Sequence, residues 1–184
     1  MSGSSTRLST PRQILVFISG LGFVVSTAWH ALTLFGRELP NSLSMTLFVG
    51  VFVVWLPAVI TILPLNERIA ENRRDTWKII MEGAPTWMVL LCLYVGIYAF
   101  INFFLTTGMI TGSVSSTDEH FQRVGSAIAM VFYSAASAIF VAAGARENAV
   151  RCPEGHLVFP GQDRCSICGQ VPESQRGTFL KHGA

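Results

Sequence analysis

The chain has 184 residues, of which 51% are hydrophobic and only 13% are charged. Soluble proteins carry roughly 25% charged residues, so this composition excludes an ordinary soluble domain and indicates a membrane protein. The formal net charge of +2 is too small to create the basic field that nucleic-acid-binding proteins use, so nucleic acid is not an expected partner.

Four apolar segments follow one another along the chain. Each is long enough to cross a hydrocarbon core about 30 Å thick as a helix of roughly 20 residues. None contains Asp, Glu, Lys or Arg, and none shows the alternation that is typical of a barrel strand. The sequence therefore predicts an all-α membrane protein, a four-transmembrane-helix bundle within residues 1–148. Its spans are residues 14–35, 43–65, 87–107 and 125–145.

Lysine and arginine are distributed unevenly among the segments that connect these spans. Only Arg37 and Arg123, of 13 basic residues, lie in the first and third connections. Because cytoplasmic loops are enriched in Lys and Arg, we expect a multi-pass protein of the cell's inner (plasma) membrane with cytoplasmic N- and C-termini. A signal peptide cleaved near residues 26–28 is the alternative, but the apolar run continues past that point.

The connection between the second and third spans has the mixed character of a surface helix. Apolar residues recur at helical spacing among charged ones, and Trp77 is the type of side chain that anchors a helix in the headgroup layer. The pattern predicts a helix that lies in the membrane interface. A solvated extension of the second span fits it equally well.

Two polar residues, His30 and Asn102, lie inside the predicted first and third spans. Each is about 16 or 17 residues from the cytoplasmic start of its span, so both are expected at a similar depth in the outer leaflet. Such a pair could bind a polar solute or carry a proton. We favour the structural alternative, in which neutral His30 forms a hydrogen bond with Asn102 or with a hydroxyl such as that of Thr27.

The fourth predicted span repeats small residues at every fourth position. These residues are Ser134, Ala138 and Ala142. Small side chains allow a neighbouring helix backbone to approach closely. We therefore expect this face of the fourth span to be packed against another helix.

A metal-ligand pattern follows the last span. The ligand types are spaced Cys-x3-His-x8-Cys-x2-Cys, at Cys152, His156, Cys165 and Cys168. Three thiolates and one imidazole form a closed tetrahedral set that suits one structural zinc ion and leaves no open position for a substrate. Thiols stay reduced in the cytoplasm, so metal binding is favoured over disulfide formation.

This stretch resembles the short bacterial and archaeal zinc ribbons, in which Cys-Pro-x-Gly-His is followed by a short hairpin and then Cys-x-x-Cys-Gly. The match covers residues 152–169, although Arg164 stands where many members have an aromatic residue. The resemblance implies that two turns meet on one zinc ion, with the four residues named above as its ligands. We expect a cytosolic zinc ribbon at residues 149–171 and a flexible tail at residues 172–184. The general layout also resembles that of uncharacterised bacterial four-helix membrane proteins, which implies no activity.

Together these patterns favour an integral membrane protein that presents a structural zinc ribbon for protein–protein interaction or complex assembly. The sequence has no nucleophile with an adjacent base, phosphate loop or paired carboxylates, so an enzyme is not favoured. A small oligomeric transporter or channel with a polar site at His30 and Asn102 is the alternative. A haem or quinone redox subunit ranks below both, because His120, the only other histidine on that side, lies outside the apolar runs. The expected partners are the lipid bilayer and either another protein or a second copy of the chain.

Overall fold

Four long helices form the membrane part of the protein in a computed structural model, which describes residues 10–37, 40–107 and 117–172. By length and composition, each is suited to cross a membrane. The predicted all-α, four-helix membrane bundle is therefore confirmed, with a small Cys/His cluster after the last helix. The helices are α1 (Thr10–Leu34), α2 (Asn41–Ile62), α5 (Thr86–Thr106) and α6 (Thr117–Glu147).

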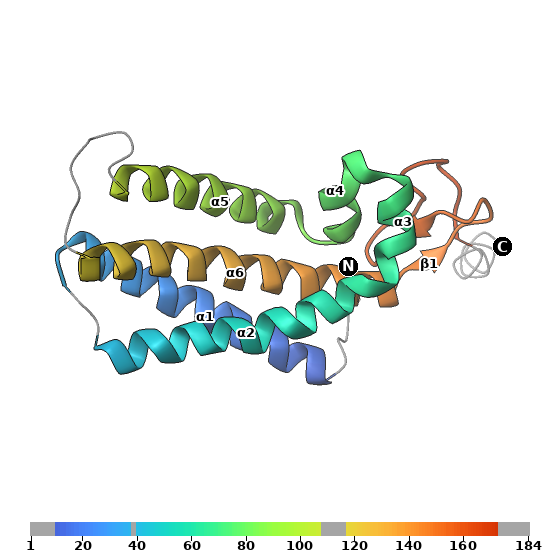
Figure 1. Cartoon of the computed structure of the whole chain (residues 1–184). Helices are drawn as coiled ribbons and strands as arrows, with labels where there is room; N and C mark the ends of the chain where they lie inside the picture. Colours follow the sequence, from blue (N-terminus) through green and yellow to red (C-terminus); the bar gives the residue numbers. More distant parts are fainter. Residues whose placement is uncertain (1–9, 38–39, 108–116, 173–184) are drawn as a thin grey trace.

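Helix α6 lies at the centre of the bundle. Figure 1 shows α5 on one side of it and α1 and α2 on the other, and α6 packs against all three. In its most apolar stretch 78% of the α6 residues are buried, against 17–22% in the corresponding stretches of the other three helices. Those outer helices expose many large apolar side chains, which suits contact with lipid hydrocarbon.

Small side chains allow α6 to be surrounded in this way. The three residues of the predicted repeat, Ser134, Ala138 and Ala142, are all buried. Ser137 is also buried, and its hydroxyl lies 2.8 Å from that of Ser19 on α1. The small-residue face expected from the sequence therefore meets neighbouring helices, as close helix packing in a membrane requires.

One large buried side chain, Tyr133, directly precedes this run of small residues. Its ring lies against Gly22 of α1, and its hydroxyl faces Gly50 of α2. The hydroxyl donates a hydrogen bond of 2.9 Å to the backbone carbonyl of Leu47. Tyr133 thus joins α1, α2 and α6 at one level, and two glycines provide the space for it.

The connection between α2 and α5 forms a compact corner and not one interfacial helix. A 3-10 turn, η1 (Leu63–Leu65), continues α2 into α3 (Asn66–Glu71), so the predicted extension of the second span describes this first part. At Asn72 the backbone leaves the helical region, with φ −127° and ψ 56°. A second turn, η2 (Arg73–Asp75), then leads into α4 (Thr76–Ile80).

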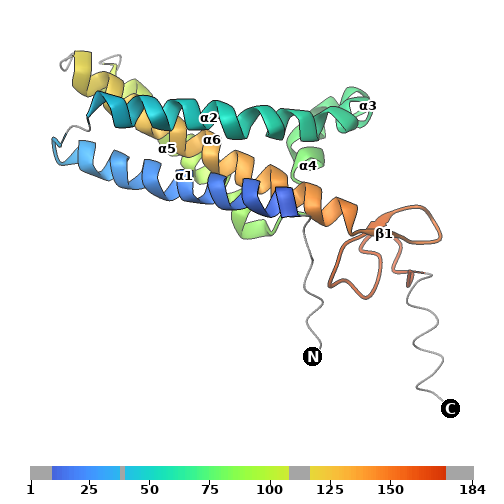
Figure 2. The same cartoon turned by 90° about the horizontal axis from the view of Figure 1, so that it is seen from below.

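The segment after α6 begins with a short hairpin. Strands β1 (Val150–Arg151) and β2 (Leu157–Val158) are antiparallel, with Val150 opposite Val158. Figures 1 and 2 show this segment at the end of the bundle where α3 and α4 lie. Only two residues separate the end of α6 from the hairpin, so the central helix leads directly into the predicted ligand cluster.

We predict that Gly22→Ala lowers the stability of the detergent-solubilised protein by about 1–3 kcal/mol, because its methyl group would overlap the Tyr133 ring. The thermal unfolding midpoint measures this effect. Gly20→Ala is the matched control: it lies on the same helix, and nothing lies within 4 Å of its added methyl group. Since alanine favours helix over glycine, the midpoint of this control should stay level or rise. If both variants lowered the midpoint equally, the close contact between Gly22 and the Tyr133 ring would be contradicted.

Candidate metal centre

The first half of the site is a tight turn between β1 and β2. The Cys152 N–H donates to the His156 carbonyl at 3.0 Å, and the Gly155 N–H donates to the Cys152 carbonyl at 2.8 Å. Gly155 has φ +82°, a left-handed conformation that glycine adopts without steric cost. The turn therefore brings the Cys152 and His156 side chains to the same side.

The second half is a similar turn that carries the other two cysteines. The Cys165 N–H donates to the Gln170 carbonyl at 2.9 Å, and the Gly169 N–H donates to the Cys165 carbonyl at 2.8 Å. Gly169 has φ +72°, so a side chain at this position would strain the turn. Cys165 and Cys168 therefore lie on one short loop that faces the first turn.

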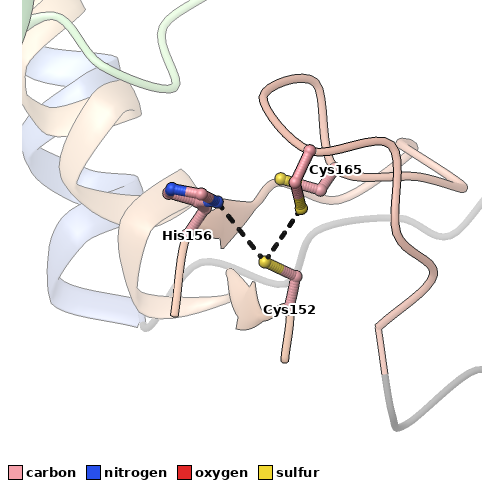
Figure 3. A group of neighbouring side chains, drawn as sticks. Cys152, His156 and Cys165 are labelled. Carbon is pink, nitrogen blue, oxygen red and sulfur yellow. Dashed lines mark hydrogen bonds between the residues drawn. The ribbon is translucent and has the colours of Figure 1, made fainter. Parts of the chain in front are cut away.

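All four predicted ligands meet between these turns. Their ligand atoms lie within 4.8 Å of one another. The Cys152 sulfur is 3.7 Å from His156 Nδ1 and 3.6 Å from the Cys168 sulfur, and the approach of His156 to Cys152 can be followed in Figure 3. A tetrahedral ion with metal–sulfur bonds of about 2.3 Å separates its sulfur ligands by about 3.8 Å. The spacing therefore fits a single four-coordinate metal ion.

The surroundings of the cluster favour the ionised form of one cysteine, Cys165. Cys152 and Cys165 are buried and pack with Val158, which is 1% exposed. The backbone N–H of Cys168, aided by that of Ile167, lowers the pKa of the Cys165 thiol to about 6, although burial opposes this shift. Since the thiolate is the form that binds a metal, Cys165 is prepared for coordination at neutral pH.

The cluster is attached to the membrane part through its hairpin. The Phe159 ring, which follows β2, lies against Gly83 in the corner before α5, and Ala145 near the end of α6 lies next to the same glycine. Gly83 has φ +92°, and any side chain there would meet the ring. The ligand cluster is therefore packed on the bundle and is not only tethered to it.

Arg146 strengthens the same junction from the last turn of α6. Its Nη1 donates to the backbone carbonyl of Ile80 at 2.7 Å and lies 3.3 Å from that of Glu82. These carbonyls lie at the end of α4 and just beyond it, where carbonyl groups have no partner within the helix. Next to Arg146, Glu147 forms an ion pair with Arg12 of α1. The end of α6 thus binds both α4 and α1.

His30 is hydrogen-bonded to hydroxyl groups, which was one of the two predicted alternatives, but neither of the partners named in that prediction, Asn102 and Thr27, is among them. His30 Nδ1 lies 2.9 Å from the Ser126 hydroxyl, and Nε2 lies 2.7 Å from the Tyr98 hydroxyl. The Thr27 hydroxyl donates to its own helix instead, because its carbonyl partner is one turn away. Both ring nitrogens of buried His30 are engaged, which favours the structural interpretation of this residue.

Asn102 is buried on α5, one turn beyond Tyr98, and the structure gives its side-chain nitrogen no hydrogen-bond partner. The structure therefore records no hydrogen bond that joins it to His30, although both residues are buried. His120, considered above as a haem ligand, belongs to the first turn of α6, and its side chain lies outside the described residues. The sequence did not indicate that Tyr98 is a hydrogen-bond partner of His30, although its hydroxyl faces His30 from the neighbouring helix.

We predict that the purified protein carries about one metal ion per chain and that Cys165→Ser removes it, because an uncharged hydroxyl is a poor substitute for a thiolate ligand. Metal analysis of the purified protein measures the content. Cys92→Ser is the control, since Cys92 is buried in the bundle core apart from the cluster. A metal-free parent protein, or a Cys165→Ser variant with undiminished metal, would contradict the assignment.

The cluster can hold a metal with four protein ligands, a closed arrangement that leaves no coordination position for water or substrate. Such sites stabilise folds and do not activate substrates. No protein-family model, no curated protein and no solved structure matches the chain. The chemistry of the site therefore rests on the geometry of these four side chains.

Proposed function

We propose that this integral membrane protein holds a structural zinc ribbon at the cytoplasmic face of the membrane and uses it to dock a protein partner. The observation that carries the proposal is the four-ligand cluster packed on the end of the bundle. A closed metal site in this position supplies a rigid surface at a defined distance from the bilayer. Docking or complex assembly is the function that such a surface serves.

Zinc is the metal that the donor set suits best. Three sulfurs and one imidazole nitrogen at tetrahedral spacing are typical of structural zinc, whereas calcium and magnesium prefer oxygen ligands. The segment is too short to bury a core that would fold it without a metal. Zinc binding and the folding of this ribbon are therefore one event.

The ribbon surface has an apolar point that a partner could cover. Ile167 lies between the two cysteines of the second turn and is 71% exposed. The loop that carries Ile167 is held in place by two backbone hydrogen bonds. The Cys165 N–H donates to the Gln170 carbonyl, and the Gly169 N–H donates to the Cys165 carbonyl. An exposed aliphatic side chain on a rigid loop loses little conformational freedom on binding, which favours affinity.

The charge distribution supports a cytoplasmic location for the ribbon. Arg12, Arg68 and Arg146 all lie near the ribbon end of the bundle, as their ion pairs with Glu147 and Glu82 and the contacts of Arg146 indicate. This grouping supports the positive-inside assignment made from the sequence. On this basis we propose that the ribbon and both termini lie in the cytoplasm.

We predict that the paired substitutions Cys165→Ser and Cys168→Ser abolish capture of the protein partner from native membranes by the tagged protein. The partner is identified by mass spectrometry and then tested with the purified protein. Cys92→Ser should capture the partner as the parent does. If the ribbon-disrupted protein remained monodisperse in detergent and still captured the same partner, the docking function would be excluded.

A second variant separates docking from ribbon folding. Ile167→Ser leaves all four ligands in place, so its zinc content should equal that of the parent. Its affinity for the identified partner should fall about tenfold, since losing a buried aliphatic side chain costs about 1–2 kcal/mol. Equal affinity in parent and variant would show that the partner does not bind through this point.

We predict that a fluorescent reporter fused after residue 184 becomes fluorescent, while a reporter enzyme that is active only outside the cytoplasm stays inactive at the same position. The reason is the excess of basic residues at the ribbon end of the bundle. The reverse pattern would place the ribbon outside the cytoplasm. That result would also remove the reducing environment on which the zinc assignment depends.

A further inference from the structure

An open groove lies beside the corner that joins α4 to α5. Its volume is about 440 Å³, within the range of about 300–1,000 Å³ that is typical of small-molecule sites. We call it the interface groove. Its lining residues are Arg74, Asp75, Trp77, Lys78, Met81, Glu82 and Val89.

The groove crosses the boundary between polar and apolar surroundings. Val89 lies in the first turn of the membrane-spanning helix α5, so one end of the groove reaches the hydrocarbon edge. Trp77 and Met81 continue the apolar wall, and Trp77 is 45% exposed. Tryptophan side chains are enriched at this depth in membranes because they have an apolar body and a polar N–H. An occupant must therefore have both an apolar and a polar part.

The polar wall of the groove favours a negatively charged occupant. The Glu82 carboxylate lies 3.0 Å from the Arg68 guanidinium, and the Asp75 carboxylate lies 3.8 Å from the Lys78 ammonium. Each acidic side chain of the groove thus already has a cation beside it. Within the described part of the chain, Arg74 forms no ion pair, and its side chain is exposed. The charged side chain of the groove that still lacks an opposite charge is therefore the cation Arg74.

We propose that the interface groove binds one anionic glycerophospholipid from the surrounding leaflet. Its phosphodiester lies at Arg74, its glycerol backbone against Trp77, and its acyl chains pass Val89 into the bilayer. A soluble phosphate ester lacks the apolar part that this wall requires. A zwitterionic lipid brings an ammonium group that finds its carboxylate partners already paired. This inference requires membrane insertion but does not depend on zinc or on a docking partner.

Native mass spectrometry of the detergent-purified protein with added phospholipid tests the proposal. Dioleoyl phosphatidylglycerol should give one bound lipid at concentrations where dioleoyl phosphatidylcholine and phosphatidylethanolamine bind about fivefold more weakly. The ratio follows from the attraction of about one basic residue for an anionic headgroup. Equal binding of all three lipids would overturn the preference for an anionic headgroup.

The chain offers matched controls for both walls of the groove. Arg74→Gln should weaken phosphatidylglycerol binding about fivefold, whereas Arg73→Gln removes the same charge from a neighbour that does not line the groove. Trp77→Ala should also weaken it, whereas Trp87→Ala removes an exposed tryptophan of α5 outside the groove. Equal losses in each variant and its control would show that the lipid binds elsewhere or only through the general bilayer. All four side chains are exposed, so thermal midpoints should stay close to that of the parent.

Discussion

The close packing of α6 against three other helices is the constraint on which the rest of the structure depends. A helix enclosed in this way can carry few large side chains, and the buried run from Ser134 to Ala138 meets that requirement. Between membrane helices there is no hydrophobic driving force, so close contact and hydrogen bonds must hold them together. Tyr133 provides both, because its ring occupies a glycine slot and its hydroxyl binds a carbonyl of α2. Tyr133 thus fixes the positions of α1 and α2 relative to α6.

The ligand cluster takes its position from the same helix. It begins just after α6 ends, and Arg146 and Phe159 connect this end of the helix to the corner before α5. Arg146 donates hydrogen bonds to carbonyl groups at the end of α4, while the Phe159 ring packs against Gly83. These contacts explain how a segment with only two two-residue strands acquires a defined place on the bundle. The interface groove, which Met81 and Glu82 line, and the ligand cluster, which Phe159 packs against Gly83, therefore adjoin the same corner.

His30 illustrates how polar groups are accommodated inside this bundle. A buried imidazole without partners would cost several kcal/mol, and two hydroxyls from two different helices remove that cost. The same two bonds join α1 to α5 and α6 at the end of the bundle far from the ligand cluster. The residue is therefore comparable to Tyr133, as a polar connection that fixes helix positions.

The sequence by itself determined the number of spans, the small-residue face of the fourth span and the four metal-ligand candidates. These features depend on local composition and on spacing within one segment, which the chain carries without reference to its neighbours. Only the tertiary structure decided that α6 is central, that Tyr98 and Ser126 bind His30, and that residues 66–80 fold into a corner. Each of these depends on the order and rotation of helices that are distant in the chain. Periodicity shows which face of a helix is buried, but not which helix covers it, because many arrangements bury the same apolar area.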